Sequence, residues 1–268
     1  MRTEGPGRHE HPRTRAATAM HRSERSGARL CERANLPNRT ERYESPFRIP
    51  LAMTTVRDLD ALVRRRHLLH HPFYTAWSRG ELSIETLREY AGEYYHFEVN
   101  FPRYVAGAYS RITDPSARRV LLENLLDEEG RSPTHPELWL DFARAIGAPS
   151  PPSRPSPSTR RLLAAYERHA LRGSAPTALG ALYAYESQFP EVAAEKSRGL
   201  RAHYGIRSKA AHEFFRVHTF ADVEHSAAER RLLKGILAGN PEASHDAERG
   251  LRASLDAWWG FLDGFPVG

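Results

Sequence analysis

From Met53 to the C-terminus, apolar residues recur at helical spacing, and no segment shows the alternation of β-branched residues that is typical of a strand. Helix-start signals recur along the same stretch. Ser83, Asp114 and Asn240 each stand where an N-cap residue is expected, and the last two directly precede a proline, which the first turn of a helix tolerates. This patterning restricts the body of the chain to an all-α fold.

The expected helices form about eight segments. These are 55–70, 84–112 with a kink at Pro102, 115–131, 137–146, 158–171, 176–203, 208–238 with a break or bend, and 241–263. The Pro/Ser-rich run at 149–158 is expected to be a semi-rigid surface connection. Because the helical halves on either side of this run are each short for a core of their own, we expect a single bundle of about seven to eight helices.

Basic charge is concentrated at the N-terminus. Residues 1–52 carry 11 Arg, no Lys and 6 acidic side chains, whereas the remaining residues carry 28 basic and 27 acidic side chains. We expect 1–52 to be a disordered basic extension: a tail that touches nucleic acid, an inert extension, or sequence upstream of a true start at Met53. The last two are favoured, because runs of like charge are usually solvated tails. Since 53–268 is nearly neutral, we expect this single domain to bind no nucleic acid.

Composition excludes other classes of protein. No stretch approaches the roughly 18 consecutive apolar residues that a membrane helix needs, so no membrane association is expected. The single cysteine, Cys31, excludes a disulfide framework and a thiolate metal cage. We therefore expect a globular protein in the cytoplasm.

Ionisable residues lie on apolar stripes of three expected helices, because positions i, i+4, i+7 and i+11 share one helix face. These residues are Glu128, followed seven residues later by His135, then Glu186, and then His218, Asp222 and His225. A buried unpaired charge is costly, so such groups must be paired, protonated or bound to metal. Each of them alone is more often a satisfied core residue. Together, three carboxylates and three imidazoles predict a two-metal site for iron or manganese rather than a structural zinc.

Two further Glu-x-x-His matches have the spacing used by carboxylate di-iron bundles. Glu242 and His245 lie in a polar stretch and are expected on a solvated face. Glu93 and His96 lie in a tyrosine-rich helix, but no second carboxylate accompanies His96 at helical spacing. We therefore expect neither pair to bind metal.

Several stretches resemble one known family. They are HHPFYTAWSRGEL (70–82), EYYHFEVNFPRYVAGAYSR (93–111), LLENLLDEEGRSPTHPELW (121–139), ALYAYESQFPEVAAEKSRGL (181–200) and HTFADVEH (218–225). The chain is similar here to the CADD family, named after a chlamydial protein associating with death domains. This family belongs to the heme-oxygenase-like di-metal oxidases and is related in fold to thiaminase II and pyrroloquinoline-quinone synthase. The resemblance covers 53–268, and all six family ligand positions are filled by the residues on the three stripes.

The resemblance implies a function that the residues alone do not indicate. CADD-type proteins are understood to make 4-aminobenzoate, a folate precursor, from their own side chains in a single turnover. Tyr74 would supply the aromatic ring and Lys196 the amino nitrogen, with two Fe ions (or Mn/Fe), O2 as co-substrate and an external reductant. Without the resemblance, Tyr74 reads as a packed aromatic and Lys196 as a solvated helix residue. Lys196, ten residues after Glu186 on one expected helix, would flank the metals about 80° off the Glu186 face.

Other features stay open at this stage. Six tyrosines could carry radicals or simply pack the core: Tyr90, Tyr94, Tyr95, Tyr104, Tyr183 and Tyr185. A first alternative function is a di-iron oxidase of the same fold that acts on a diffusible substrate. A second is a protein-interaction module with a structural metal. A homodimer is expected from fold relatives, and the electron donor is not identified.

Overall fold

The computed structural model describes residues 54–267. The expected extension at 1–52 and the candidate start at Met53 lie outside the described residues. Within 54–267 there are eleven α-helices, one 3-10 turn (η1, Leu68–His70), one π-helical turn (η2, Glu167–Leu171) and no strand. The α-helices are α1 (Val56–Arg65), α2 (Pro72–Arg79), α3 (Ile84–Glu98), α4 (Phe101–Arg111), α5 (Pro115–Glu129), α6 (His135–Ala145), α7 (Pro157–Tyr166), α8 (Ala175–Glu186), α9 (Phe189–His203), α10 (Lys209–Leu237) and α11 (Pro241–Leu262).

The predicted helix starts are confirmed at atomic detail. The side chains of Ser83, Asp114 and Asn240 each accept a hydrogen bond from the backbone N–H three residues further on. Each therefore satisfies one N–H group that the first turn leaves without a helical partner. These local signals set where α3, α5 and α11 begin.

The helix count exceeds the expected seven to eight because two expected helices are divided and α2 was not predicted. The 84–112 segment forms α3 and α4, and the 176–203 segment forms α8 and α9. Pro102 and Pro190 stand in the first turns of α4 and α9, where a missing N–H costs nothing, so each proline begins a helix rather than kinking one. The 208–238 segment contains no break, since α10 runs as one continuous helix of 29 residues.

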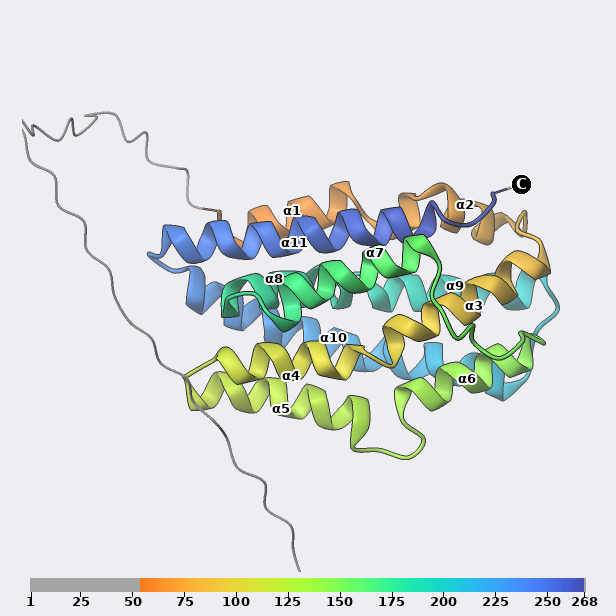
Figure 1. The fold of residues 1–268 in the computed structure, drawn as a ribbon, viewed down its shortest axis with the longest axis horizontal. Helices are drawn as coiled ribbons and strands as arrows, with labels where there is room; N and C mark the ends of the chain where they lie inside the picture. Colours follow the sequence, from red (N-terminus) through yellow and green to blue (C-terminus); the bar gives the residue numbers. More distant parts are fainter. Residues whose placement is uncertain (1–53, 268) are drawn as a thin grey trace, which may run out of the picture. The chain divides into compact units, whose positions relative to one another are not determined.

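The helices pack as one bundle around a shared core (Figure 1). Helix α11 lies along α8 and α7, whereas α10 lies along α9, α6 and α8. The closest approach is between α8 and α11. A Cβ at Gly180 would collide with the backbone oxygen of Ala247, and a Cβ at Gly250 with that of Thr177, so both positions require glycine.

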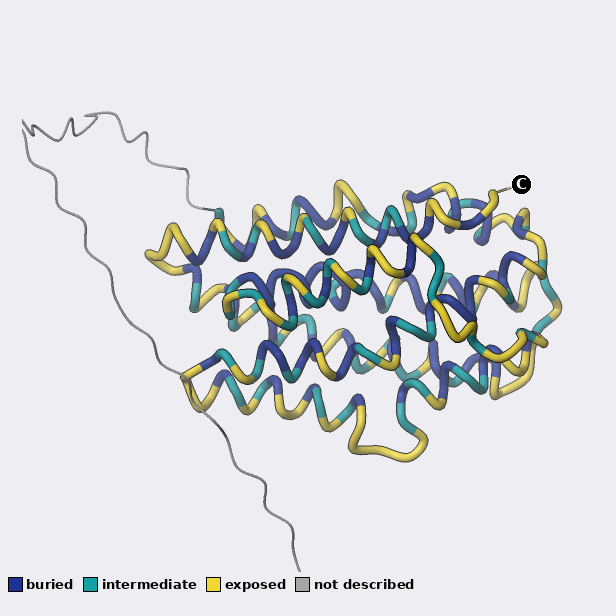
Figure 2. The backbone as a smooth tube through the Cα atoms, viewed as in Figure 1, coloured by how far each residue is buried: buried dark blue, intermediate teal, exposed yellow. Residues whose placement is uncertain are grey.

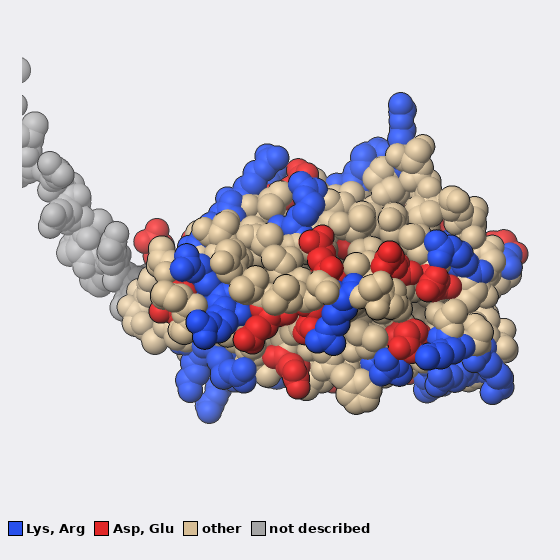
Figure 3. Space-filling model, turned by 90° about the horizontal axis from the view of Figure 1, so that it is seen from below, with Lys and Arg blue, Asp and Glu red and all other residues tan. Residues whose placement is uncertain are grey.

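Burial follows the predicted helix faces. Buried positions line the inner side of each helix (Figure 2). Residues 149–157 of the predicted 149–158 connection are exposed or half-buried, as predicted, whereas Ser158 is buried in the first turn of α7. Basic and acidic side chains intermix over the face that Figure 3 shows. No helix within the described residues is both long enough and apolar enough to cross a membrane. The described chain is thus an all-α bundle, as predicted, whose interior contains both aromatic and ionisable side chains.

Candidate metal centre

Buried ionisable side chains gather where α3, α5, α6, α8 and α10 meet. They are Glu98, Glu128, His135, Glu186, His218, Asp222, His225 and Glu229, each at most 7% exposed. Several come from helix ends: Glu98 and Glu186 are the last residues of α3 and α8, and His135 is the first residue of α6. The other residues lie within α5 and α10, so five separate helices supply the cluster.

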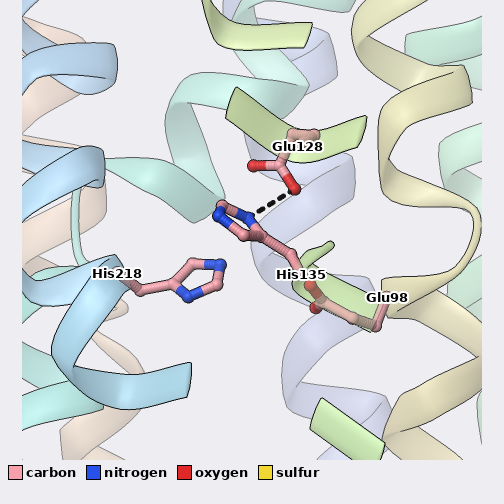
Figure 4. Close-up of side chains that lie close together, drawn as sticks. All are labelled: Glu98, Glu128, His135 and His218. Carbon is pink, nitrogen blue, oxygen red and sulfur yellow. Dashed lines mark hydrogen bonds and ion pairs between the residues drawn. The ribbon is translucent and has the colours of Figure 1, made fainter. Parts of the chain in front are cut away.

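The first group consists of Glu98, Glu128, His135 and His218, which offer one ligand atom each within 4.8 Å of one another (Figure 4). His135 Nδ1 donates a hydrogen bond to Glu128 Oε2 at 2.8 Å. His218 Nδ1 donates to the backbone oxygen of Phe214 at 2.8 Å, which leaves Nε2 of His218 as an acceptor. A backbone carbonyl that holds one ring nitrogen in this way is a common means of orienting a metal-binding histidine.

The second group consists of Glu128, Glu186 and His225, again with ligand atoms within 4.8 Å. Asn124 Nδ2 donates to Glu186 Oε1 at 2.9 Å, and His225 Nε2 donates to Asp127 Oδ2 at 3.1 Å. Nδ1 of His225 has no hydrogen-bond partner. Glu128 belongs to both groups, so it would be a ligand common to the two sites if each held a metal ion.

The structure brings five of the six sequence-predicted ligands into these two groups. Asp222, the sixth, is buried beside them, with Oδ1 3.7 Å from His225 Nδ1 and Oδ2 without a partner. Sequence reasoning missed Glu98 and Glu229. The signal was available, since Glu98 continues the stripe of Tyr94 by four residues and Glu229 continues that of His225 by four.

The donor set fits metal ions. Burial raises the pKa of Glu98 to about 8 and that of Asp222 to about 7, and it also raises the pKa of Glu186. One oxygen each of Glu98, Glu186 and Asp222, and both oxygens of Glu229, lack a hydrogen-bond partner. A buried carboxylate without a hydrogen-bond partner is stabilised when a cation binds it. A set of carboxylates and imidazoles suits Fe(II) or Mn(II). The residues present therefore fit a two-metal centre.

Lys196 lies in an aromatic cage. Its Nζ is 4.6–5.8 Å from the ring centroids of Tyr74, Tyr90, Tyr94, Trp139, Phe189 and Phe215. Lys196 is 0% exposed and its Nζ has no hydrogen-bond partner. The interpretation as a solvated helix residue is therefore wrong. The expected offset of about 80° between Lys196 and the Glu186 face does not apply. Helix α8 ends at Glu186, and Lys196 lies in a separate helix, α9.

Tyr74 is at the edge of the same cage. Its hydroxyl lies 2.9 Å from that of Tyr90, and a second tyrosine pair, Tyr94 and Tyr185, is hydrogen-bonded nearby. Burial raises the pKa of Tyr74 and that of Tyr90, so both phenols are protonated in the neutral range. Both residues that the family resemblance singled out thus lie in the same buried aromatic cage.

The two Glu-x-x-His pairs lie in different surroundings. Glu242 and His245 are exposed on a solvated face, as predicted. Glu93 accepts hydrogen bonds from the backbone N–H of Ser156 and the hydroxyl of Thr159, which ties α3 to the start of α7. Neither pair joins a group of ligand atoms among the described residues.

A family model described as "Iron-containing redox enzyme" matches residues 88–259, which include every residue of both groups. The chain belongs to this family. It is 38% identical over 218 residues to a 4-aminobenzoate synthase of Chlamydia muridarum, covering 80% of this chain and 91% of that protein. It is 36% identical over 223 residues to a 4-aminobenzoate synthase of Nitrosomonas europaea, covering 79% and 90%.

Solved structures agree on the fold. A domain from Shewanella denitrificans described as having a heme oxygenase-like fold superposes with a TM-score of 0.64 at 18% identity, covering 78% of this chain and 88% of that one. The predicted resemblance and the heme-oxygenase-like all-α bundle are therefore confirmed. An iron-containing redox enzyme is also what the buried carboxylate and imidazole donors suit.

Proposed function

We propose that this chain makes 4-aminobenzoate from its own side chains, with Tyr74 as the source of the ring and Lys196 as the source of the amino nitrogen. The observation that carries the proposal is the position of Lys196 Nζ, which is fully buried, lacks a polar partner and lies 5.5 Å from the Tyr74 ring. The names of the relatives in Chlamydia muridarum and Nitrosomonas europaea support the product.

The proposed metal ligands are Glu128, His135, Glu186, His218, Asp222 and His225, with Glu98 beside them. Two Fe ions, or one Mn and one Fe, would supply the activation of O2, with electrons from an external reductant. Glu128, which belongs to both groups of ligand atoms, would hold both ions, and the backbone oxygen of Phe214 orients the His218 ring. Asn124 orients Glu186 through its 2.9 Å hydrogen bond.

The aromatic cage affects both side chains in ways that suit this chemistry. Burial lowers the pKa of Lys196 well below its usual range, which favours the neutral amine, the form whose lone pair can form a bond. The surrounding rings exclude water from Tyr74 and hold it in place. In the conversion of tyrosine to 4-aminobenzoate, the ring keeps Cβ, which O2 oxidises to the carboxyl carbon as the Cα–Cβ bond breaks. A ring C–N bond forms as the Cε–Nζ bond of Lys196 breaks, and the phenol oxygen leaves as water.

Isotope labelling tests the origin of the product. The full chain is produced with ring-13C tyrosine and ε-15N lysine, loaded with Fe(II) without oxygen, and exposed to O2 and a reductant. Mass spectrometry should find 4-aminobenzoate that carries both labels, at no more than one per chain. Tyr74→Phe and Lys196→Ala should each abolish it, whereas Tyr166→Phe, at an equally buried tyrosine outside the cage, should not.

The alternatives give different results. An oxidase acting on a diffusible substrate predicts unlabelled product, retained in Tyr74→Phe. An interaction module with a structural metal predicts that ligand substitutions unfold the chain with no small-molecule product to lose. Either result would overturn the self-sacrificing mechanism.

A further inference from the structure

The proposed reaction leaves its product in an enclosed place. Tyr74 is 1% exposed and Lys196 is 0% exposed, so 4-aminobenzoate formed between them has to pass a protein wall. The product carries a carboxylate at neutral pH. Its way out is therefore expected where the wall is thin and where cationic side chains favour an anion.

A groove between α9 and α10 meets both conditions. It has a volume of about 930 Å³ and is lined by Ala194 and Ser197 of α9 and by Phe215 and Thr219 of α10. Five cationic side chains line it against one carboxylate, that of Glu213. The cationic residues are Arg198, Arg201, Arg207, Lys209 and Arg216.

Two of these cations are already paired, and others are free to meet a ligand. Arg198 pairs with Glu195 and Arg216 with Glu213. Arg201 and Arg207 are exposed and make no ion pair within the described residues. These two arginines are the natural partners for an incoming or departing carboxylate.

Phe215 borders both the groove and the aromatic cage. It belongs to the lining of the groove, and its ring lies 5.8 Å from Lys196 Nζ, although the residue is 0% exposed. Its neighbours across the core are the rings of Phe142 and Trp139, at 4.9 and 6.1 Å. Phe215 is thus the one residue that the groove lining and the aromatic cage share.

We propose that the α9–α10 groove binds the carboxylate of 4-aminobenzoate through Arg201 and Arg207, and that Phe215 is the gate through which the product leaves the cage. The inference rests on the proposed function for the identity of the ligand. The groove is wide enough for a molecule of this size, which fits the usual dimensions of a small-molecule site.

Equilibrium dialysis of the metal-free full chain tests the binding site without any turnover. The probes are 4-aminobenzoate and its neutral analogue 4-aminobenzamide. The acid should bind more tightly than the amide, and Arg201→Gln combined with Arg207→Gln should weaken binding of the acid about fivefold, as expected for two exposed ion pairs. Arg118→Gln combined with Arg119→Gln, on α5 outside the groove, should change nothing. Equal binding of acid and amide, or no effect of the groove pair, would overturn the site.

Reductive methylation tests the gate. The chain has three lysines, and Lys209 and Lys234 are exposed internal standards for the buried Lys196. In wild type, peptide mass spectrometry should show complete modification of the two standards while Lys196 stays unmodified. Phe215→Ala, and to a smaller extent Phe215→Leu, should speed modification of Lys196 by at least about tenfold, because opening then needs no ring rotation.

Phe214→Ala is the matched control, since it removes the same ring one residue away at a buried position that does not line the groove. Equal exposure of Lys196 in both alanine variants would mean general loosening and would overturn the gate. Neither readout needs product to be formed. If labelled product forms but the dialysis and methylation tests both fail, the product leaves by another route and this inference is wrong. If both tests succeed but no labelled product forms, only the proposed function is wrong.

Discussion

Replacement of Lys196 by methionine should stabilise the fold while abolishing product. Lys196 is fully buried, and its Nζ has no hydrogen-bond partner. Methionine has a similar length and no charge, so it fills the cage without the amine. Three effects act on the ammonium form: the six surrounding rings and the carboxylate of Glu98 attract it, and burial opposes it.

Magnitudes decide this competition. Cation–π contacts contribute at most about 2 kcal/mol, whereas burying an ammonium costs several kcal/mol, so burial wins and the pKa of Lys196 falls well below 10.5. The unfolded chain then holds a proton that the folded chain has lost. Stability is therefore lost as the pH falls through the unfolded value of 10.5, and the loss levels off below the folded-state pKa. Between pH 10 and pH 8 the wild type should lose stability relative to Lys196→Met, by no more than about 1.4 kcal/mol for each pH unit.

Urea unfolding of the metal-free proteins at several pH values measures this difference. At pH 10 Lys196→Met should be more stable by about 1–3 kcal/mol, the cost of a buried amine without a partner, and the gain should grow as the pH falls to 8. Lys234→Met, at an exposed position, should stay within about 0.5 kcal/mol of wild type at each pH. A difference that does not vary with pH would show that the cage holds a charged ammonium, and the reasoning would be refuted.

Two further predictions concern the metal centre and the helix packing. Asp127→Asn should weaken iron binding by about 10–100-fold at the group containing His225, because Asp127 orients that ring through a 3.1 Å hydrogen bond. Titration with Fe(II) followed by metal analysis measures it, with the exposed neighbour Glu224→Gln as control, and unchanged stoichiometry and affinity would contradict it. Gly250→Ala should destabilise the bundle by about 1–3 kcal/mol through collision with the α8 backbone, whereas Gly260→Ala, which meets no atom within 4 Å, should stabilise it by about 0.5–1 kcal/mol. Thermal unfolding of the two variants compares them directly, and a stable Gly250→Ala would mean that α8 and α11 can move apart.

Helix positions could be predicted where a local signal exists. The side chains of Ser83, Asp114 and Asn240 act within three residues of themselves, so their caps were readable from the chain. Breaks were harder to predict. Pro102 is compatible both with a kinked helix and with the first turn of a new one, and packing of α3 and α4 against different partners decides between them.

The candidate ligands on apolar stripes could also be predicted, because helical spacing alone places His218, Asp222 and His225 on one face. Glu98 was harder to predict as a metal ligand, because it is a single carboxylate on a tyrosine-rich helix. It becomes a candidate ligand once the structure places the end of α3 beside Glu128 and His135.

The sequence by itself determined an all-α bundle and the helix faces that carry the ionisable residues, since both follow from the period of the helix. It also carried the family resemblance that singled out Tyr74 and Lys196. Only the tertiary structure decided that Lys196 is buried among six rings, one of which belongs to Phe215 in the lining of a basic groove. Burial and proximity between α9, α10 and α3 depend on how separate helices pack, and no local pattern in the chain encodes those distances.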